Sequence, residues 1–150
     1  MPKAYYSTVI PHEADAVWEE IRPFDHYSWA GIPGTTIIED GRAADEVGSI
    51  RCFSGPNGPV RQVLIAHSNP ERSYSYAFVS AAPMGMRNYR ATIRVAPVVD
   101  CASAFVEWRA EFDMEGAAGD AVARQLERDG LAVWLAALGE HMRRIAAAAG

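Results

Sequence analysis

The chain has 150 residues, of which 49% are hydrophobic and 22% charged, and its formal net charge is −5 at pH 7. This length and composition predict one domain, 1–150, whose core needs neither disulfides nor a metal, and they exclude disordered, collagen-like and coiled-coil chains. Because no segment concentrates lysine and arginine, we expect no nucleic-acid partner.

The cysteine count and the N-terminal sequence predict a reducing compartment. Cys52 and Cys101 show no CxxC spacing and are too few for a disulfide framework, so we interpret them as reduced thiols. The first residues, MPKAYY, contain no apolar secretion signal, and no window approaches the roughly 20 apolar residues that a membrane-spanning helix needs. We therefore expect a soluble cytoplasmic protein that does not insert into membranes.

The first part of the chain predicts one strand followed by two short helices. Residues 3–10 (KAYYSTVI) are rich in β-branched and aromatic types, which favour a strand, and Pro11 ends it. Residues 12–21 (HEADAVWEEI) carry apolar side chains at helical spacing. Residues 24–30 (FDHYSWA) are the candidate for the second short helix.

Six further strands are predicted in the middle of the chain. They are residues 35–40, 49–53, 60–67, 73–80, 87–95 and 103–113. Glycine, asparagine and proline in the segment 55–59 (GPNGP) indicate a hairpin, because they supply positive φ angles and a fixed bend. The last two strands alternate apolar and charged residues, which is typical of antiparallel strands with one solvated face.

A long helix is predicted for residues 119–148, where apolar residues form one stripe at helical spacing. At about 1.5 Å per residue it would be roughly 45 Å long, enough to cross a whole sheet. Gly130 lies in this stripe between Leu126 and Trp134. Because a glycine inside a helix costs about 1 kcal/mol relative to alanine, it indicates a close approach or a bend at this point.

This order of elements is that of the helix-grip fold, and the sequence resembles the SRPBCC superfamily of START-like, birch-pollen-allergen-like and polyketide cyclase/dehydrase-type proteins. Four segments carry the resemblance: 9–31 (VIPHEADAVWEEIRPFDHYSWAG), 47–53 (VGSIRCF), 89–95 (YRATIRV) and 105–113 (FVEWRAEFD). It implies an α+β fold in which a curved seven-stranded antiparallel sheet wraps around the long C-terminal helix, with two short helices after the first strand.

The resemblance also implies a cavity between sheet and helix. Most members of the superfamily hold an apolar small molecule there, and some cyclise or dehydrate polyketides. Gln62 stands where many bacterial relatives carry a glutamate, which weakens an inherited acid–base mechanism. No cofactor is implied.

The more apolar face of each strand should meet the helix and line this cavity. Together with Arg51, the candidate ligand-binding residues are Gln62, Tyr74, Tyr76, Tyr89 and Trp108 from the strands and Trp134, Leu138 and Met142 from the helix. The last three can equally be ordinary core residues, and Gln62 a satisfied core amide.

Arg51, Tyr76 and Tyr89 are the candidate catalytic residues. Neither face of the strand that holds Arg51 is clearly apolar, so its orientation stays open. If it points inward, it can bind a carboxylate or stabilise an enolate; if outward, it is an ordinary solvated charge. The tyrosines can donate hydrogen bonds to a ligand carbonyl, act as acids if their pKa falls, or simply pack their rings.

The spacing of the histidines predicts no metal site. His12, His26, His67 and His141 are isolated in the sequence, without HxH, HExxH or a Cys/His cluster. Asp25, His26, Tyr27 and Trp29 lie where the two short helices meet and are candidates for the edge of the cavity mouth. His26 is either a proton-transfer group or a surface histidine. A GxSxG nucleophile motif and glycine-rich phosphate loops are also absent.

The sequence therefore predicts a protein that binds a hydrophobic, aromatic or polyketide-like small molecule in an internal cavity, as a monomer or homodimer. One alternative is a polyketide cyclase or dehydratase with Arg51 as oxyanion partner and Tyr76 or Tyr89 as acid or base. Another is an interaction module whose cavity is filled by its own side chains.

Overall fold

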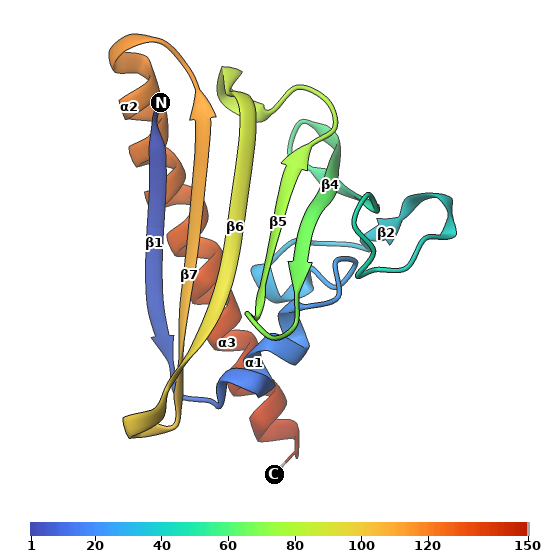
Figure 1. Ribbon diagram of the computed structural model, residues 1–150, viewed down its shortest axis with the longest axis vertical. Coiled ribbons are helices and arrows are strands. Elements are labelled where there is room, and N and C mark those ends of the chain that lie inside the picture. The colour runs from blue at the N-terminus through green and yellow to red at the C-terminus, as the bar shows by residue number, and fades with distance from the viewer. Residues whose placement is uncertain (150) are drawn as a thin grey trace.

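The computed structural model describes residues 1–149 and contains a curved antiparallel sheet with a long C-terminal helix (Figure 1). The strands are β1 (Lys3–Ile10), β2 (Ile37–Ile38), β3 (Ile50–Gly55), β4 (Gly58–Ser68), β5 (Ser73–Phe78), β6 (Arg87–Val98) and β7 (Ser103–Asp113). Their order across the sheet is β1-β7-β6-β5-β4-β3-β2. The predicted α+β helix-grip fold with seven strands is thus confirmed.

The helices lie where the apolar spacing predicts them. The helix α1 (Ala14–Ile21) follows β1, and a continuous C-terminal helix is made of α2 (Gly116–Leu126), the π-helical turn η5 (Glu127–Leu131) and α3 (Ala132–Ala149). Figure 1 shows this helix running obliquely along one face of the sheet, from the end that holds the N-terminus to the opposite end. Across residues 1–149 there is no helix with the length and apolarity needed to span a membrane.

The alternation in the last two strands separates a buried face from a solvated one. On β6 the buried side chains are Tyr89, Ala91, Ile93 and Val95, and on β7 they are Ala104, Val106, Trp108, Ala110 and Phe112. The register pairs Ile93 with Trp108, so these side chains lie beside each other on the face that meets the helix. Burial of each such side chain contributes about 1.5–3 kcal/mol.

Several element boundaries differ from the predicted ones. Only Ser28–Ala30 forms a short 3₁₀ turn, η1, so the predicted helix over 24–30 is mostly irregular. The strand predicted for 35–40 is reduced to β2, because the 3₁₀ turn η2 (Glu39–Gly41), with Asp40 at φ 60°, ends the pairing. The remaining 3₁₀ turns are η3 (Pro83–Gly85) and η4 (Val99–Cys101).

The hairpin predicted at residues 55–59 is present but tighter. Gly55 pairs with Gly58, so only Pro56 and Asn57 form the loop between β3 and β4. Gly58 adopts φ +118°, which a residue with a Cβ rarely tolerates. Positive φ is therefore supplied by a glycine here and not by the asparagine.

Gly130 lies in the π-helical turn and is buried. A Cβ built on it would lie 3.0 Å from Cη2 of Trp134 and 3.1 Å from Cδ1 of Leu126. The predicted close approach is thus present, and the helix accommodates it with an irregular turn.

Candidate functional site

A large hollow lies beside the β3–β4 hairpin, bounded by β5, the start of β6 and the middle of the C-terminal helix. Its volume is about 760 Å³, within the range of small-molecule sites. Most of its lining is apolar, including Ile32, Phe53, Val60, Phe78, Met84, Met86, Leu126 and Trp134. We refer to this hollow as the cavity.

Four of the predicted ligand-binding residues line the cavity. They are Gln62, Tyr76, Tyr89 and Trp134. The two tyrosine rings come from adjacent strands, and their centres are 6.3 Å apart. These residues supply polar groups to a mostly apolar wall, as expected where a ligand has to be oriented, and the charged residues Arg61 and Asp129 also belong to the lining.

Arg51 points inward, and its side chain is fully buried, at 0% exposure. It does not line the cavity itself but lies one layer behind it, against the lining residues Gln62, Tyr27 and Tyr76. The register places it opposite Gln62, and its Nε donates a hydrogen bond of 2.7 Å to Oε1 of that residue. The open question of its orientation is thereby answered.

Aromatic rings surround the Arg51 guanidinium. Its central carbon is 3.8 Å from the ring centre of Tyr27, 4.2 Å from that of Phe24 and 4.9 Å from that of Tyr76. Such contacts attract a cation through the negative potential of the ring faces, more strongly where water is excluded. They hold the charge in place without neutralising it.

The hydrogen bonds of Arg51 are incomplete. Nη1 donates to the carbonyl oxygen of Phe24 and to the hydroxyl of Tyr74, both at 3.3 Å, whereas Nη2 has no partner among residues 1–149. None of the ion pairs in this part of the chain includes Arg51. A buried cation without an anion is costly, so a positive field remains available to a ligand.

The tyrosines around the cavity are neutral hydrogen-bonding groups. Burial raises the pKa of Tyr27 and of Tyr76 well above the ordinary value, and it also raises the pKa of Tyr89. Arg51 lowers each of these values, but burial is the larger effect. These phenols can therefore donate hydrogen bonds near neutral pH, but they are poor general bases.

The remaining predicted residues lie outside the cavity wall. Tyr74 is fully buried and contacts Arg51 in the layer behind the wall. Trp108 packs between Trp29 and Trp134, with ring centres 5.8 and 5.2 Å away. Leu138 and Met142 belong to the packed core.

The segment 24–30 borders both the cavity, where Tyr27 is expected, and Arg51, whose contact with this segment is not predicted by the sequence. Tyr27 lines the cavity, and Tyr27 and Phe24 provide the closest rings to Arg51. The unusual density of aromatic residues in FDHYSWA is the signal that could have identified this role. A helical interpretation of the segment did not indicate which side chains point inward.

The histidines are less isolated than their sequence positions indicate. His26 and His141 lie with ring centres 5.7 Å apart, and Glu20 joins them. Sequence spacing does not indicate this proximity, because His141 reaches Glu20 and His26 only in the folded chain. His12 and His67 are not part of the group.

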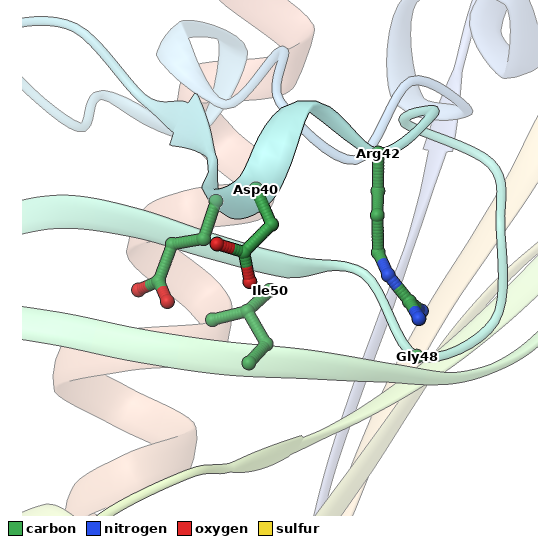
Figure 2. Close-up of a pocket in the computed structure, with 5 residues that line it drawn as sticks. Asp40, Arg42, Gly48 and Ile50 are labelled. Atoms are coloured by element: carbon green, nitrogen blue, oxygen red, sulfur yellow. The ribbon is translucent and has the colours of Figure 1, made fainter.

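A smaller hollow of about 220 Å³ opens at the surface near η2 and the start of β3 (Figure 2). Asp40, Arg42, Gly48 and Ile50 lie around it. Arg42 pairs with Glu46 at 3.4 Å, so its charge is already partnered. The hollow is smaller and more polar than the cavity, and we do not assign a ligand to it.

Solved structures with the same fold come from bacteria and plants. A protein from Nitrosospira multiformis is 27% identical with a TM-score of 0.76, covering 95% of this chain and 99% of its own. A protein from Thermobifida fusca is 24% identical with a TM-score of 0.83, and the match covers 96% of this chain and 95% of that protein. Norcoclaurine synthase from Thalictrum flavum, in complex with dopamine and hydroxybenzaldehyde, is 17% identical with a TM-score of 0.72. The match covers 95% of this chain and 86% of the synthase.

The comparison of sequences identifies the family. No curated protein matches the chain at a significant level. The family model described as polyketide cyclase / dehydrase and lipid transport matches residues 1–149, which is nearly the whole chain. The protein therefore belongs to the polyketide cyclase / dehydrase and lipid transport family.

Proposed function

We propose that this protein binds a hydrophobic small molecule, aromatic or polyketide-like, in the cavity, with an anionic or electron-rich oxygen of that molecule turned toward Arg51. The observation that carries this proposal is a buried guanidinium without a counter-ion directly behind an apolar wall. An apolar body with one polar end matches such a wall. Gln62, Tyr76 and Tyr89 are the groups that would contact the polar end.

The family and its fold support a ligand of this class. The family description includes lipid transport as well as polyketide chemistry, and both concern largely apolar molecules. Norcoclaurine synthase, which shares the fold, has been solved with two aromatic molecules, dopamine and hydroxybenzaldehyde. The aromatic rings of Tyr27, Phe53, Phe78 and Trp134 would offer stacking surfaces to such a molecule.

Native mass spectrometry of the purified protein, followed by titration with two fluorescent probes, tests the proposal. The first probe is anilinonaphthalene sulfonate, and the second is N-phenyl-1-naphthylamine, which has the same rings without the sulfonate. We expect saturable one-to-one binding of both, with tighter binding of the anionic probe. No adduct and no probe binding to the folded protein would contradict the proposal and favour an interior filled by its own side chains.

A matched pair of variants locates the bound probe. Val60 lines the cavity, so Val60→Trp would occupy part of its volume, whereas Val99 is 85% exposed and remote from it. We expect Val60→Trp to weaken binding at least tenfold and Val99→Trp to leave it unchanged. Equal affinities for the two variants would mean that the probe binds elsewhere.

A polyketide cyclase or dehydratase acting in the same cavity is the second candidate function. The neutral phenols and the unneutralised guanidinium favour it, because a preorganised cation and O–H donors stabilise the oxyanion of an enolate. Burial raises the pKa of Tyr89, so its hydroxyl keeps its proton and would donate a hydrogen bond to the oxyanion instead of transferring the proton. If the hydroxyl of Tyr89 is catalytic, Tyr89→Phe abolishes turnover of a bound ligand but barely changes its affinity.

A further inference from the structure

The geometry points to a binding site for a divalent first-row transition metal ion at Glu20, His26 and His141, outside the cavity. One ligand atom from each of these residues lies within 4.8 Å of the other two. None of the three lines the cavity. The inference is thus independent of the function proposed above.

The three residues come from segments that the fold brings side by side. Glu20 is in the last turn of α1, His26 follows that helix, and His141 is on α3. Nε2 of His141 lies 2.7 Å from Oε1 of Glu20, which ties the two helices together. A metal at this point would therefore cross-link α1 to the C-terminal helix.

The hydrogen bonding of His26 leaves a ring nitrogen ready for a metal. Its Nδ1 lies 2.8 Å from the carbonyl oxygen of Glu20. Because a carbonyl oxygen only accepts hydrogen bonds, Nδ1 carries the proton and donates it, and Nε2 keeps its lone pair. A histidine that donates its other N–H to a backbone carbonyl is the usual arrangement at metal sites, since this bond fixes the tautomer.

The contact between His141 and Glu20 needs only a small adjustment. Metal–ligand bonds of about 2.0–2.2 Å in tetrahedral geometry separate two ligand atoms by roughly 3.3 Å. The 2.7 Å contact would have to open by about half an ångström, with the metal ion replacing the shared proton. The side chains of Glu20 and His141 are 28% and 14% exposed, so they can move and a metal can enter.

The donor set decides the class of metal. Two imidazole nitrogens and one carboxylate oxygen suit zinc, cobalt or nickel better than magnesium or calcium, which prefer all-oxygen sites. Three protein ligands leave a fourth position for water or an added molecule. Zinc and cobalt are therefore the appropriate probes.

Titration of the chelator-treated full chain with Zn²⁺ and with Co²⁺ tests the site. Calorimetry should give one equivalent of zinc, and cobalt should develop the visible absorption of a tetrahedral complex. Both metals should raise the unfolding temperature, because they bind the folded state. We expect His26→Gln, His141→Gln and Glu20→Gln each to weaken zinc binding at least tenfold.

The controls separate this site from adventitious ligands. His12→Gln, His67→Gln and Cys101→Ser change other metal-binding side chains and should leave the affinity unchanged. His26→Gln preserves the contact between His141 and Glu20, so its loss of zinc binding would not reflect a broken helix contact. The inference is overturned if the wild type binds neither metal at sub-millimolar concentration, or if a control variant abolishes binding while the three ligand variants do not.

Discussion

Replacement of Arg51 by methionine separates the contribution of this side chain to stability from its contribution to binding. Two close ring contacts are each worth about 2 kcal/mol in a desolvated site. The hydrogen bond to Gln62 adds about 1.5–3 kcal/mol. Against these stand a desolvation cost of several kcal/mol and about 1–3 kcal/mol for the unpartnered Nη2. The two longer hydrogen bonds of Nη1, to Phe24 and Tyr74, add a smaller gain. The two sides nearly cancel, so Arg51→Met should change the free energy of unfolding by less than about 2 kcal/mol.

The effect on an anionic ligand should be larger. The guanidinium carbon is 4.9 Å from the ring centre of Tyr76, which lines the cavity. With a contact distance of about 3.5 Å beyond that ring, the charges are roughly 8 Å apart, and at an effective dielectric constant of about 20 they attract by about 2 kcal/mol. This corresponds to an affinity difference of about thirtyfold.

The assay compares anilinonaphthalene sulfonate with its neutral analogue in the wild type and in Arg51→Met, with urea unfolding measured in parallel. We expect a loss of about thirtyfold for the anionic probe and less than threefold for the neutral one. Equal losses for both probes would refute the electrostatic argument. Destabilisation by more than about 4 kcal/mol would show that Arg51 is mainly structural.

Three further predictions concern the same region. Gln62→Glu gives Arg51 a counter-ion, so it should weaken binding of the anionic probe as much as Arg51→Met does, measured in the same titration. Burial raises the pKa of Tyr76, so the contribution of this group to stability is complete below pH 10 and is lost as the pH rises above 10. The free energy of unfolding, measured with urea at pH 9 and at pH 11, should therefore decrease between these values by about 1.4 kcal/mol less in Tyr76→Phe than in the wild type. Gly139→Ala, with no atom within 4 Å of the added Cβ, should stabilise the protein by about 0.5–1 kcal/mol in thermal unfolding. Gly130→Ala should be less stable than Gly139→Ala by about 1–3 kcal/mol, because its Cβ would press on Trp134 and Leu126, and the opposite order would contradict the packing at Gly130.

The faces of the strands could be predicted because successive side chains of a strand point to opposite sides. Alternation places Tyr76 and Tyr89 on the inward face, and both line the cavity. The same rule does not say which part of the helix an inward side chain meets. It therefore also predicts Trp108 in the cavity wall, whereas Trp108 packs in the core against Trp134. Alternation identifies a face but not the distance from the hollow.

Arg51 shows a second limit of sequence reasoning. Its direction follows from the register that places it opposite Gln62, and a single strand sequence does not contain its partner's register. The group of Glu20, His26 and His141 shows a third, because His141 is more than a hundred positions from the other two and meets them only in the folded chain. Spacing rules for metal sites detect neighbours within one element and miss such contacts.

The pairing of β1 with β7 has a consequence for how the chain folds during synthesis. In the sheet β1 has β7 as its single neighbour, with Lys3 opposite Glu111 and Ile10 opposite Ala104. At about 5–20 residues per second, the ribosome needs roughly 5–20 s to add the hundred residues between these partners. Throughout that time β1 has no native hydrogen-bonding partner, although it is the first strand of this sheet to be made. Completion of the sheet is thus a late event set by translation, and the nascent N-terminal strand is the segment most exposed to association with other chains.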